Sequence, residues 1–149
     1  MALQKYNARD VDFQVEDFSS PGTWITIGGI NTFTKGHDEE TADTTTFASA
    51  GQAESQKMQI SKTLELEGFR LRDDATGAGD PGQAKVEALA ERLGELSLGR
   101  VRFSHKNDTT WLVWTAHVNL GDQSGGNNDK TSWSATFTRS GAESTVAKP

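Results

Sequence analysis

Acidic side chains and one imidazole gather between positions 34 and 57, where metal or acid–base chemistry could arise. His37 precedes three consecutive acids, Asp38–Glu40. These donors could hold a metal ion, but the stretch has neither a helical i, i+4 pair nor the H-E-x-x-H pattern. A solvated acidic loop explains it better, and we expect no metal site.

Two other stretches have the composition of ligand loops without the spacing. Asp122–Asp129 is rich in side-chain oxygens but lacks the EF-hand pattern, so a hairpin turn is expected. Gly77–Gly82 precedes a predicted helix but lacks the Lys-Ser/Thr of a phosphate loop. No carboxylate stands in an apolar context that would raise its pKa for acid–base catalysis. We therefore expect no catalytic residue, no cofactor and no enzyme activity.

Composition narrows the class of protein further. The chain has 149 residues, which fits one domain, residues 1–149. It has no cysteine, so disulfides and thiolate chemistry are excluded. A net charge of −6 without a basic stripe disfavours tight nucleic-acid binding. No apolar run is long enough to span a bilayer, and we expect no secretory signal.

Period-2 alternation of apolar and polar residues predicts a largely β structure. Val11, Phe13 and Val15 alternate with polar residues, as do Trp133, Ala135 and Phe137 near the end of the chain. Strands are expected at 11–18, 23–33, 57–72, 99–105, 111–120 and 131–139, with a short additional strand possible at 44–47. Gly28-Gly29 suggests a bulge or a close backbone approach, and a phase change after Gly68 suggests a second bulge.

One helix is expected at 80–96. Asp80 is suited to the N-cap and Pro81 to the first helical position. The apolar residues that follow have helical spacing: Val86, Leu89, Ala90, Leu93 and Leu96. The elements together predict an α+β, mainly β, fold: an antiparallel β-sandwich or barrel with one flanking α-helix.

The sequence 125–141, GGNNDKTSWSATFTRSG, closely resembles the C-terminal strand of major tail tube proteins of long-tailed, non-contractile (siphovirus-type) bacteriophages. Three further stretches agree in order: WITIGGINTF at 24–33, SKTLELEGF at 61–69 and DPGQAKVEALA at 80–90. The resemblance covers about 23–141. Its motifs are structural, so its specificity comes from their combination.

The resemblance implies a phage tail tube fold and a structural virion protein. Subunits of this family form hexameric rings that stack head-to-tail into the conduit for DNA ejection. The implied partners are the chain itself, tape measure, tail terminator and tail tip proteins, and double-stranded DNA that passes without sticking. No membrane insertion is implied. The implied location is the phage tail, assembled in the host cytoplasm.

The resemblance also implies a role for the long loop at about 34–57, which would reach the neighbouring ring, as extended terminal arms at 1–10 and 140–149 often do. The loop residues concerned are Lys35, His37, Asp38, Glu39, Glu40, Asp43, Phe47 and Glu54.

Physical reasoning agrees with a ring. A domain of this length has a radius of gyration of about 15 Å, so one copy cannot enclose duplex DNA. A bore should repel phosphates, which suits the acidic balance. We expect the polar strand faces to line it: Gln59, Ser61, Thr63, Glu65, Glu67, Ser132, Ser134, Thr136 and Thr138.

Two alternatives stay open. A β-sandwich carbohydrate-binding or adhesin module could stack sugars on Trp24 or Trp111, although tryptophans more often fill cores or subunit contacts. A hydrolase could use Asp38 or Glu39, although no residue pattern supports it.

Overall fold

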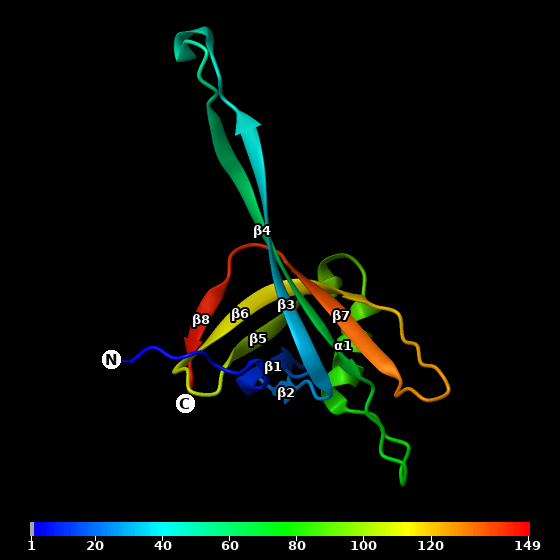
Figure 1. Ribbon diagram of the computed structural model, residues 1–149. Helices are drawn as coiled ribbons and strands as arrows, with labels where there is room; N and C mark the ends of the chain where they lie inside the picture. Colours follow the sequence, from blue (N-terminus) through cyan, green and yellow to red (C-terminus); the bar gives the residue numbers. More distant parts are fainter. Residues whose placement is uncertain (1) are drawn as a thin grey trace.

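The computed structural model describes residues 2–149 and shows a curled antiparallel sheet, one α-helix and a long projecting hairpin (Figure 1). The strands are β1 (Val11–Glu16), β2 (Trp24–Thr26), β3 (Ile30–Asp43), β4 (Ser55–Phe69), β5 (Gly99–His105), β6 (Thr110–Leu120), β7 (Ser132–Arg139) and β8 (Ser144–Ala147). The helix is α1 (Pro81–Ala90), and the 3-10 segments are η1 (Ala8–Asp10), η2 (Phe47–Ser49) and η3 (Gly94–Ser97).

All strands join one sheet in the order β2-β1-β5-β6-β7-β4-β3, and β8 pairs with the first half of β6. The sheet curls so strongly that its ends approach each other. Phe13 of β1 and Phe33 of β3 contact each other with ring centroids 5.4 Å apart, although four strands separate β1 from β3 in the sheet. The expected antiparallel barrel with a flanking helix is therefore confirmed, in the form of a single curled sheet.

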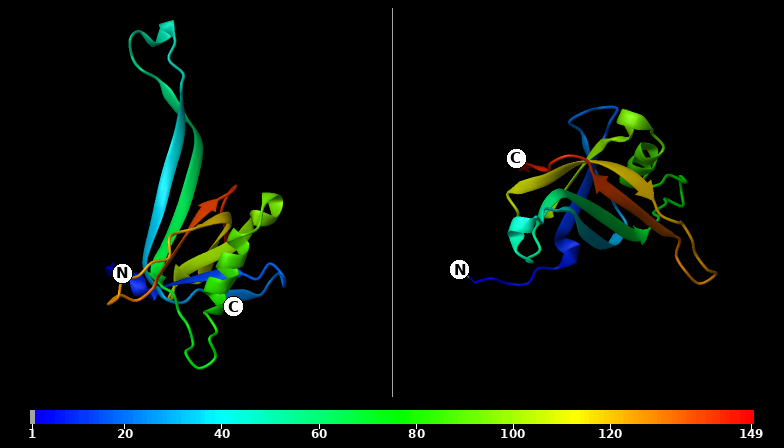
Figure 2. Two further views of the ribbon diagram at one scale, coloured as in Figure 1. Left: turned by 90° about the vertical axis from the view of Figure 1, so that its right-hand side faces the viewer. Right: turned by 90° about the horizontal axis from the view of Figure 1, so that it is seen from above.

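The core fills the inner side of this curl. Val86 and Leu89 of α1 are buried there, and α1 packs against β6, β1 and β2 (Figure 2). The strands contribute apolar residues at alternate positions: Phe13, Val15, Leu64, Leu66, Val101, Phe103, Trp114, Ala116, Val118, Trp133, Ala135 and Phe137. Period-2 alternation predicted these faces correctly, because each strand buries one side.

The largest correction concerns the expected loop at 34–57. Both its flanks are strand: β3 continues to Asp43 and β4 begins at Ser55, paired from Asp43↔Ser55 inward. Only residues 44–54 form the connection, and they contain η2 rather than the additional strand considered at 44–47. Ladder pairing between two polar strands satisfies the backbone without a buried face, so hydrophobic alternation could not reveal it.

The C-terminal stretch 140–149 is also not the extended arm expected. Residues 144–147 form β8, which continues along the same edge of β6 that β7 occupies. The N-terminal stretch agrees better, since residues 2–7 have no regular structure before η1.

Two further boundaries differ. The strand expected at 23–33 is split at Gly28-Gly29 into β2 and the start of β3. The helix expected at 80–96 ends at Ala90, and Gly94 with a φ of +65° starts η3, so Leu93 and Leu96 are exposed rather than part of the stripe.

The glycines at the base of the hairpin allow a close backbone approach. Gly29 has a φ of +77°, and a Cβ on Gly68 would collide with the Gly29 carbonyl. One register shift places an extra residue on β3, between Ile30 and Thr32, and a second places one on β4, between Lys57 and Gln59; neither lies on β4 after Gly68 as expected. No helix among residues 2–149 is both long and apolar enough to cross a membrane.

Candidate assembly surfaces

The hairpin formed by β3 and β4 projects far beyond the body, and we call its outer part, residues 36–62, the arm (Figure 1). β4 leaves its neighbour β7 after the pair Thr63↔Thr138, so the arm strands have only each other. Eight residues per strand at 3.3 Å each extend the arm by about 26 Å. Phe47 at the tip is fully exposed and Met58 is 64% exposed. Apolar side chains in such positions need a partner to leave water.

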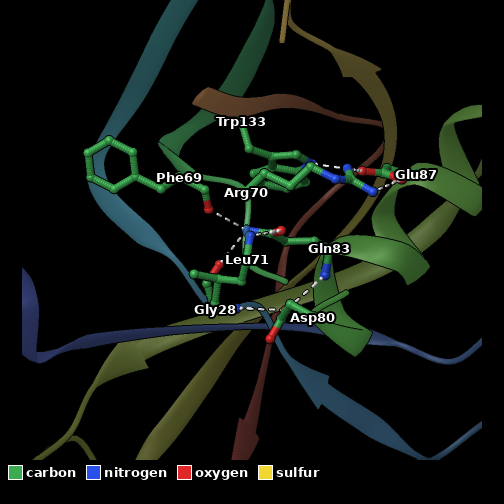
Figure 3. A network of polar contacts seen from close by, with 8 residues as sticks. All are labelled: Gly28, Phe69, Arg70, Leu71, Asp80, Gln83, Glu87 and Trp133. Carbon is green, nitrogen blue, oxygen red and sulfur yellow. Dashed lines mark hydrogen bonds and ion pairs between the residues drawn. The ribbon is translucent and has the colours of Figure 1, made fainter. Parts of the chain in front are cut away.

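A buried glutamine holds the base of the β3–β4 hairpin to α1 (Figure 3). Gln83 Nε2 donates to the carbonyls of Gly28 and Phe69, both at 2.9 Å, and its Oε1 accepts from Leu71 N at 3.2 Å. The Asp80 carboxylate caps the helix by accepting from Gln83 N at 3.0 Å, and it also accepts from Gly28 N at 3.1 Å. The predicted N-cap is confirmed, and it also joins the helix to the β2–β3 connection.

A second polar contact joins α1 to β7 and to the end of β4. Glu87 accepts from Trp133 Nε1 at 3.1 Å and pairs with Arg70 (Figure 3). Because Gln83 and Glu87 lie one turn apart, one face of α1 bonds the β2–β3 connection, the end of β4 with the residues that follow it, and β7. The β3–β4 hairpin therefore has a fixed base.

An ion-pair triad marks the point where β4 leaves the body. Glu143 lies 2.7 Å from Lys62 and 2.9 Å from Arg139. The hydrogen bond from Lys62 is the main cause that holds the pKa of Glu143 below its usual range. This bridge ties the start of the arm to the turn between β7 and β8.

Of the charged residues predicted for the loop, Lys35 lies just before the arm and the others lie on it. The Lys35 Nζ is 5.0 Å from the Phe103 ring centroid. Glu39 pairs with Lys57 at 2.6 Å and with His37 at 2.9 Å, and these contacts, Lys57 first, lower its pKa. The remaining acids have no ion pair among the described residues: Asp38, Glu40, Asp43 and Glu54.

The residues predicted to line a bore do share a face on the body. Cross-strand pairs join Thr63 to Thr138, Glu65 to Thr136 and Glu67 to Ser134, and directly opposed residues share a face. Gln59 and Ser61 lie further along β4 on the arm, opposite Glu40 and Asp38. Ser132 lies at the other end, near Ser124. The result is a polar strip running from the body onto the arm.

Glu65 and Glu67 point the same way from β4 without a cation between them. The hydrogen bond and the charge of Glu67 raise the pKa of Glu65. The strip therefore concentrates negative charge.

Sequence reasoning missed the opposite, cationic part of the outer sheet face. Arg102 lies with Trp24 at 4.3 Å and with Trp111 at 4.4 Å, from guanidinium carbon to ring centroid. Of the four tryptophans, Trp114 and Trp133 are in the core as expected, whereas Trp24 and Trp111 belong to this stack. The signal would have been two arginines two residues apart on β5, with one tryptophan on the adjacent β6 and another on β2, beyond β1.

No group of three or more histidine, aspartate and glutamate side chains is placed to hold a metal ion in the described chain. The acids with shifted pKa values are exposed or half-buried and have lysine, threonine, backbone or other carboxylate partners.

No protein-family model and no curated protein matches the sequence. Solved structures do match. A chain from the virion of a native gene transfer agent particle is 18% identical, with a TM-score of 0.67 over 96% of this chain and 100% of that one. A chain from the tail of an empty gene transfer agent particle, solved with C6 symmetry, is 18% identical, with a TM-score of 0.70 over the same shares.

The SPP1 tail tube matches as well, at 15% identity and a TM-score of 0.67, over 97% of this chain and 80% of that one. At these identities the likeness concerns the fold. The curled sheet, the single helix and the projecting hairpin together give this chain the tail tube fold that its sequence resemblance implied.

Proposed function

We propose that the chain is a structural subunit of a phage-type tail tube, which assembles into stacked hexameric rings and forms the conduit for DNA ejection. The arm is the observation that carries this proposal. It extends about 26 Å from the body, and its fully exposed Phe47 has no partner in its own subunit. A long polar hairpin costs conformational entropy, and a neighbouring copy supplies the contacts that offset the cost.

The two ends of the sheet suit the contacts that a ring needs. In a cyclic ring each copy meets its neighbour through two different faces, and the sheet has β3 at one end and β2 at the other. The gene transfer agent tail with the same fold was solved with C6 symmetry, which supports six copies per ring here. The arm then reaches the next ring, and residues 2–10 add a smaller contact.

The polar strip suits the surface of the bore. It carries hydroxyls and the Glu65–Glu67 pair, so it offers phosphates no cations to bind. DNA can then slide without adhesion, and a tape measure protein can leave before it. Terminator and tip proteins would close the two ends of the tube. The assembled protein belongs in the virion tail, and the assembly itself would take place in the host cytoplasm.

The carbohydrate-binding alternative has less support. Both faces that could receive a sugar, those of Trp24 and Trp111, are covered by the Arg102 guanidinium between them. A hydrolase based on Asp38 or Glu39 lacks a pocket with a buried acid.

Electron microscopy of the purified chain tests the proposal. We expect stacked rings or hollow tubes at high concentration. A variant with His37–Ser55 deleted should keep its circular dichroism spectrum and its core but form no tubes, because the deleted segment contributes nothing to the core. Tubes of normal length from this variant would overturn the inter-ring role of the arm.

A point variant sharpens the test. Phe47→Ala should shorten the tubes without a change in melting temperature, and Leu93→Ala is the matched control because Leu93 is also exposed. Glycan binding by a chain that stays monomeric would favour the carbohydrate module instead.

A further inference from the structure

Cationic and indole side chains from four strands or their flanks form one stack on the outer sheet face. We call this the arginine stack: Arg100, Trp24, Arg102, Trp111 and Lys148. The cations lie 5.3, 4.3, 4.4 and 4.7 Å from the ring centroids, in the order Arg100–Trp24, Arg102–Trp24, Arg102–Trp111 and Lys148–Trp111. Trp111 is buried by this stack and is not part of the core cluster.

The guanidinium at the centre of the stack keeps most of its donors free. Arg102 Nε donates to Gln14 Oε1 at 2.7 Å, and this is the only hydrogen bond of its side chain within residues 2–149. Its terminal nitrogens present four N–H groups in a planar fork that suits a carboxylate. Arg100, two residues earlier on the same face, pairs with Glu16 at 3.1 Å.

The charge of Arg102 is also uncompensated. Burial, followed by the charge of Arg100, lowers the pKa of Arg102. Gln14, its hydrogen-bond partner, is neutral. An incoming anion would therefore relieve repulsion between two guanidinium groups that the fold holds side by side.

The arm carries a matching pair of acids. Asp38 and Glu40 lie on one face of β3, opposite Ser61 and Gln59, and neither has a cationic partner in the described chain. They are two residues apart on a strand, as Arg100 and Arg102 are, so each pair spans about 6.6 Å. Two strands laid face to face can thus join both acids to both arginines in register.

The acids cannot reach the arginines of their own subunit. β4, β7 and β6 separate β3 from β5 in the sheet, and the arm points away from the body (Figure 1). A second copy is the source of the carboxylates.

We propose that Asp38 and Glu40 on the arm of one copy bind Arg100 and Arg102 in the arginine stack of another copy, an inference that rests on the proposed tube assembly. The contact is heterologous, so each copy gives one arm and receives one. DNA phosphate is a weaker occupant. Binding to a duplex backbone needs several free cations, and the stack has only three cations in all. Glu16 engages Arg100 through Nη1, which leaves the other guanidinium nitrogens of Arg100 for an arm carboxylate.

Charge reversal with mixing tests the proposal. One variant carries Asp38→Lys and Glu40→Lys, and the other carries Arg100→Glu and Arg102→Glu. Alone, each places like charges against each other, and we expect the concentration needed for tubes to rise by about tenfold or more. Mixed in equal amounts, the two variants present opposite charges at every contact between unlike copies and should restore tubes in which the two variants alternate. Asp74→Lys, which reverses an exposed acid in the loop after β4 that has no ion pair among the described residues, is the control and should change this concentration little.

Cysteine cross-linking gives a second readout that does not depend on folding of the arginine variant. The chain has no cysteine of its own. Copies with Glu40→Cys mixed with copies with Gln14→Cys should form a disulfide-linked dimer on oxidation, whereas Glu39→Cys, one residue away on the opposite face, should not.

The outcomes separate the two proposals. If the wild-type chain forms tubes but the arm reversal does not raise the concentration needed for them, the arginine contact is overturned. The same holds if no specific cross-link forms. In both cases the tube assembly stands. A wild-type chain that stays monomeric overturns both. Binding of a short DNA duplex that is lost in Arg102→Gln would reassign the stack to phosphate.

Discussion

Replacement of Gln83 by leucine should destabilise the fold and loosen the base of the β3–β4 hairpin. The Gln83 side chain is only 2% exposed and makes three hydrogen bonds, to the carbonyls of Gly28 and Phe69 and from the amide of Leu71. Leucine keeps much of the volume but provides no donor or acceptor. Three backbone groups would then lack partners in a site closed to water.

The size of the effect follows from the number of orphaned groups. Each buried polar group left unsatisfied costs about 1–3 kcal/mol. Some will find water after small shifts, so we take the low end and expect a loss of about 3 kcal/mol in the free energy of unfolding. For a chain of this length that is a fall in melting temperature of about 6–12 °C.

The assays are thermal unfolding by circular dichroism and amide hydrogen exchange. Exchange should speed up at Leu71, whose amide loses its acceptor, before the rest of the sheet opens. Gln59→Leu is the matched control, because Gln59 is an exposed residue on β4 and its change should stay within about 0.5 kcal/mol. A melting temperature for Gln83→Leu within 2 °C of the wild type, taken as about 1 kcal/mol or less, would refute the reasoning.

Three more outcomes follow from other contacts. Glu143→Gln breaks the bridge to Lys62 and should cost about 1 kcal/mol; because the folded-state pKa of Glu143 is lowered, the wild-type advantage in unfolding titrations should vanish as pH falls through that pKa. Glu65→Gln relieves repulsion from Glu67 and should raise the melting temperature at neutral pH; because the folded-state pKa of Glu65 is raised, the gain should shrink as pH falls through that pKa, and an unchanged gain would contradict it. Gly82→Ala places a methyl group against the backbone of the β2–β3 connection and should cost about 2 kcal/mol in denaturant unfolding.

Sequence patterns predicted the parts of this fold that have one buried face. Alternation in residues 131–139 placed Trp133, Ala135 and Phe137 in the core. The Asp80-Pro81 start of the helix was also predictable, because an N-cap is a local interaction. Helix length was not, since Leu93 continues the apolar spacing while the chain turns away at Gly94.

The arm shows what local patterns leave out. Residues 36–43 and 55–62 are polar, so no periodicity distinguished a paired hairpin from a loop. Their strand structure comes from the backbone ladder between them. Only the tertiary arrangement shows that β7 ends where the arm begins, which leaves the arm exposed.

The sequence by itself determined the acidic balance, the β-rich core pattern and the absence of metal or thiolate motifs, because these depend on residue type and near neighbours. The tertiary structure decided which distant residues meet. Gln83 joins α1 to Gly28 and Phe69, and Arg102 lies between Trp24 and Trp111. Such contacts depend on strand order and register across the curled sheet, and spacing along the chain does not encode either directly.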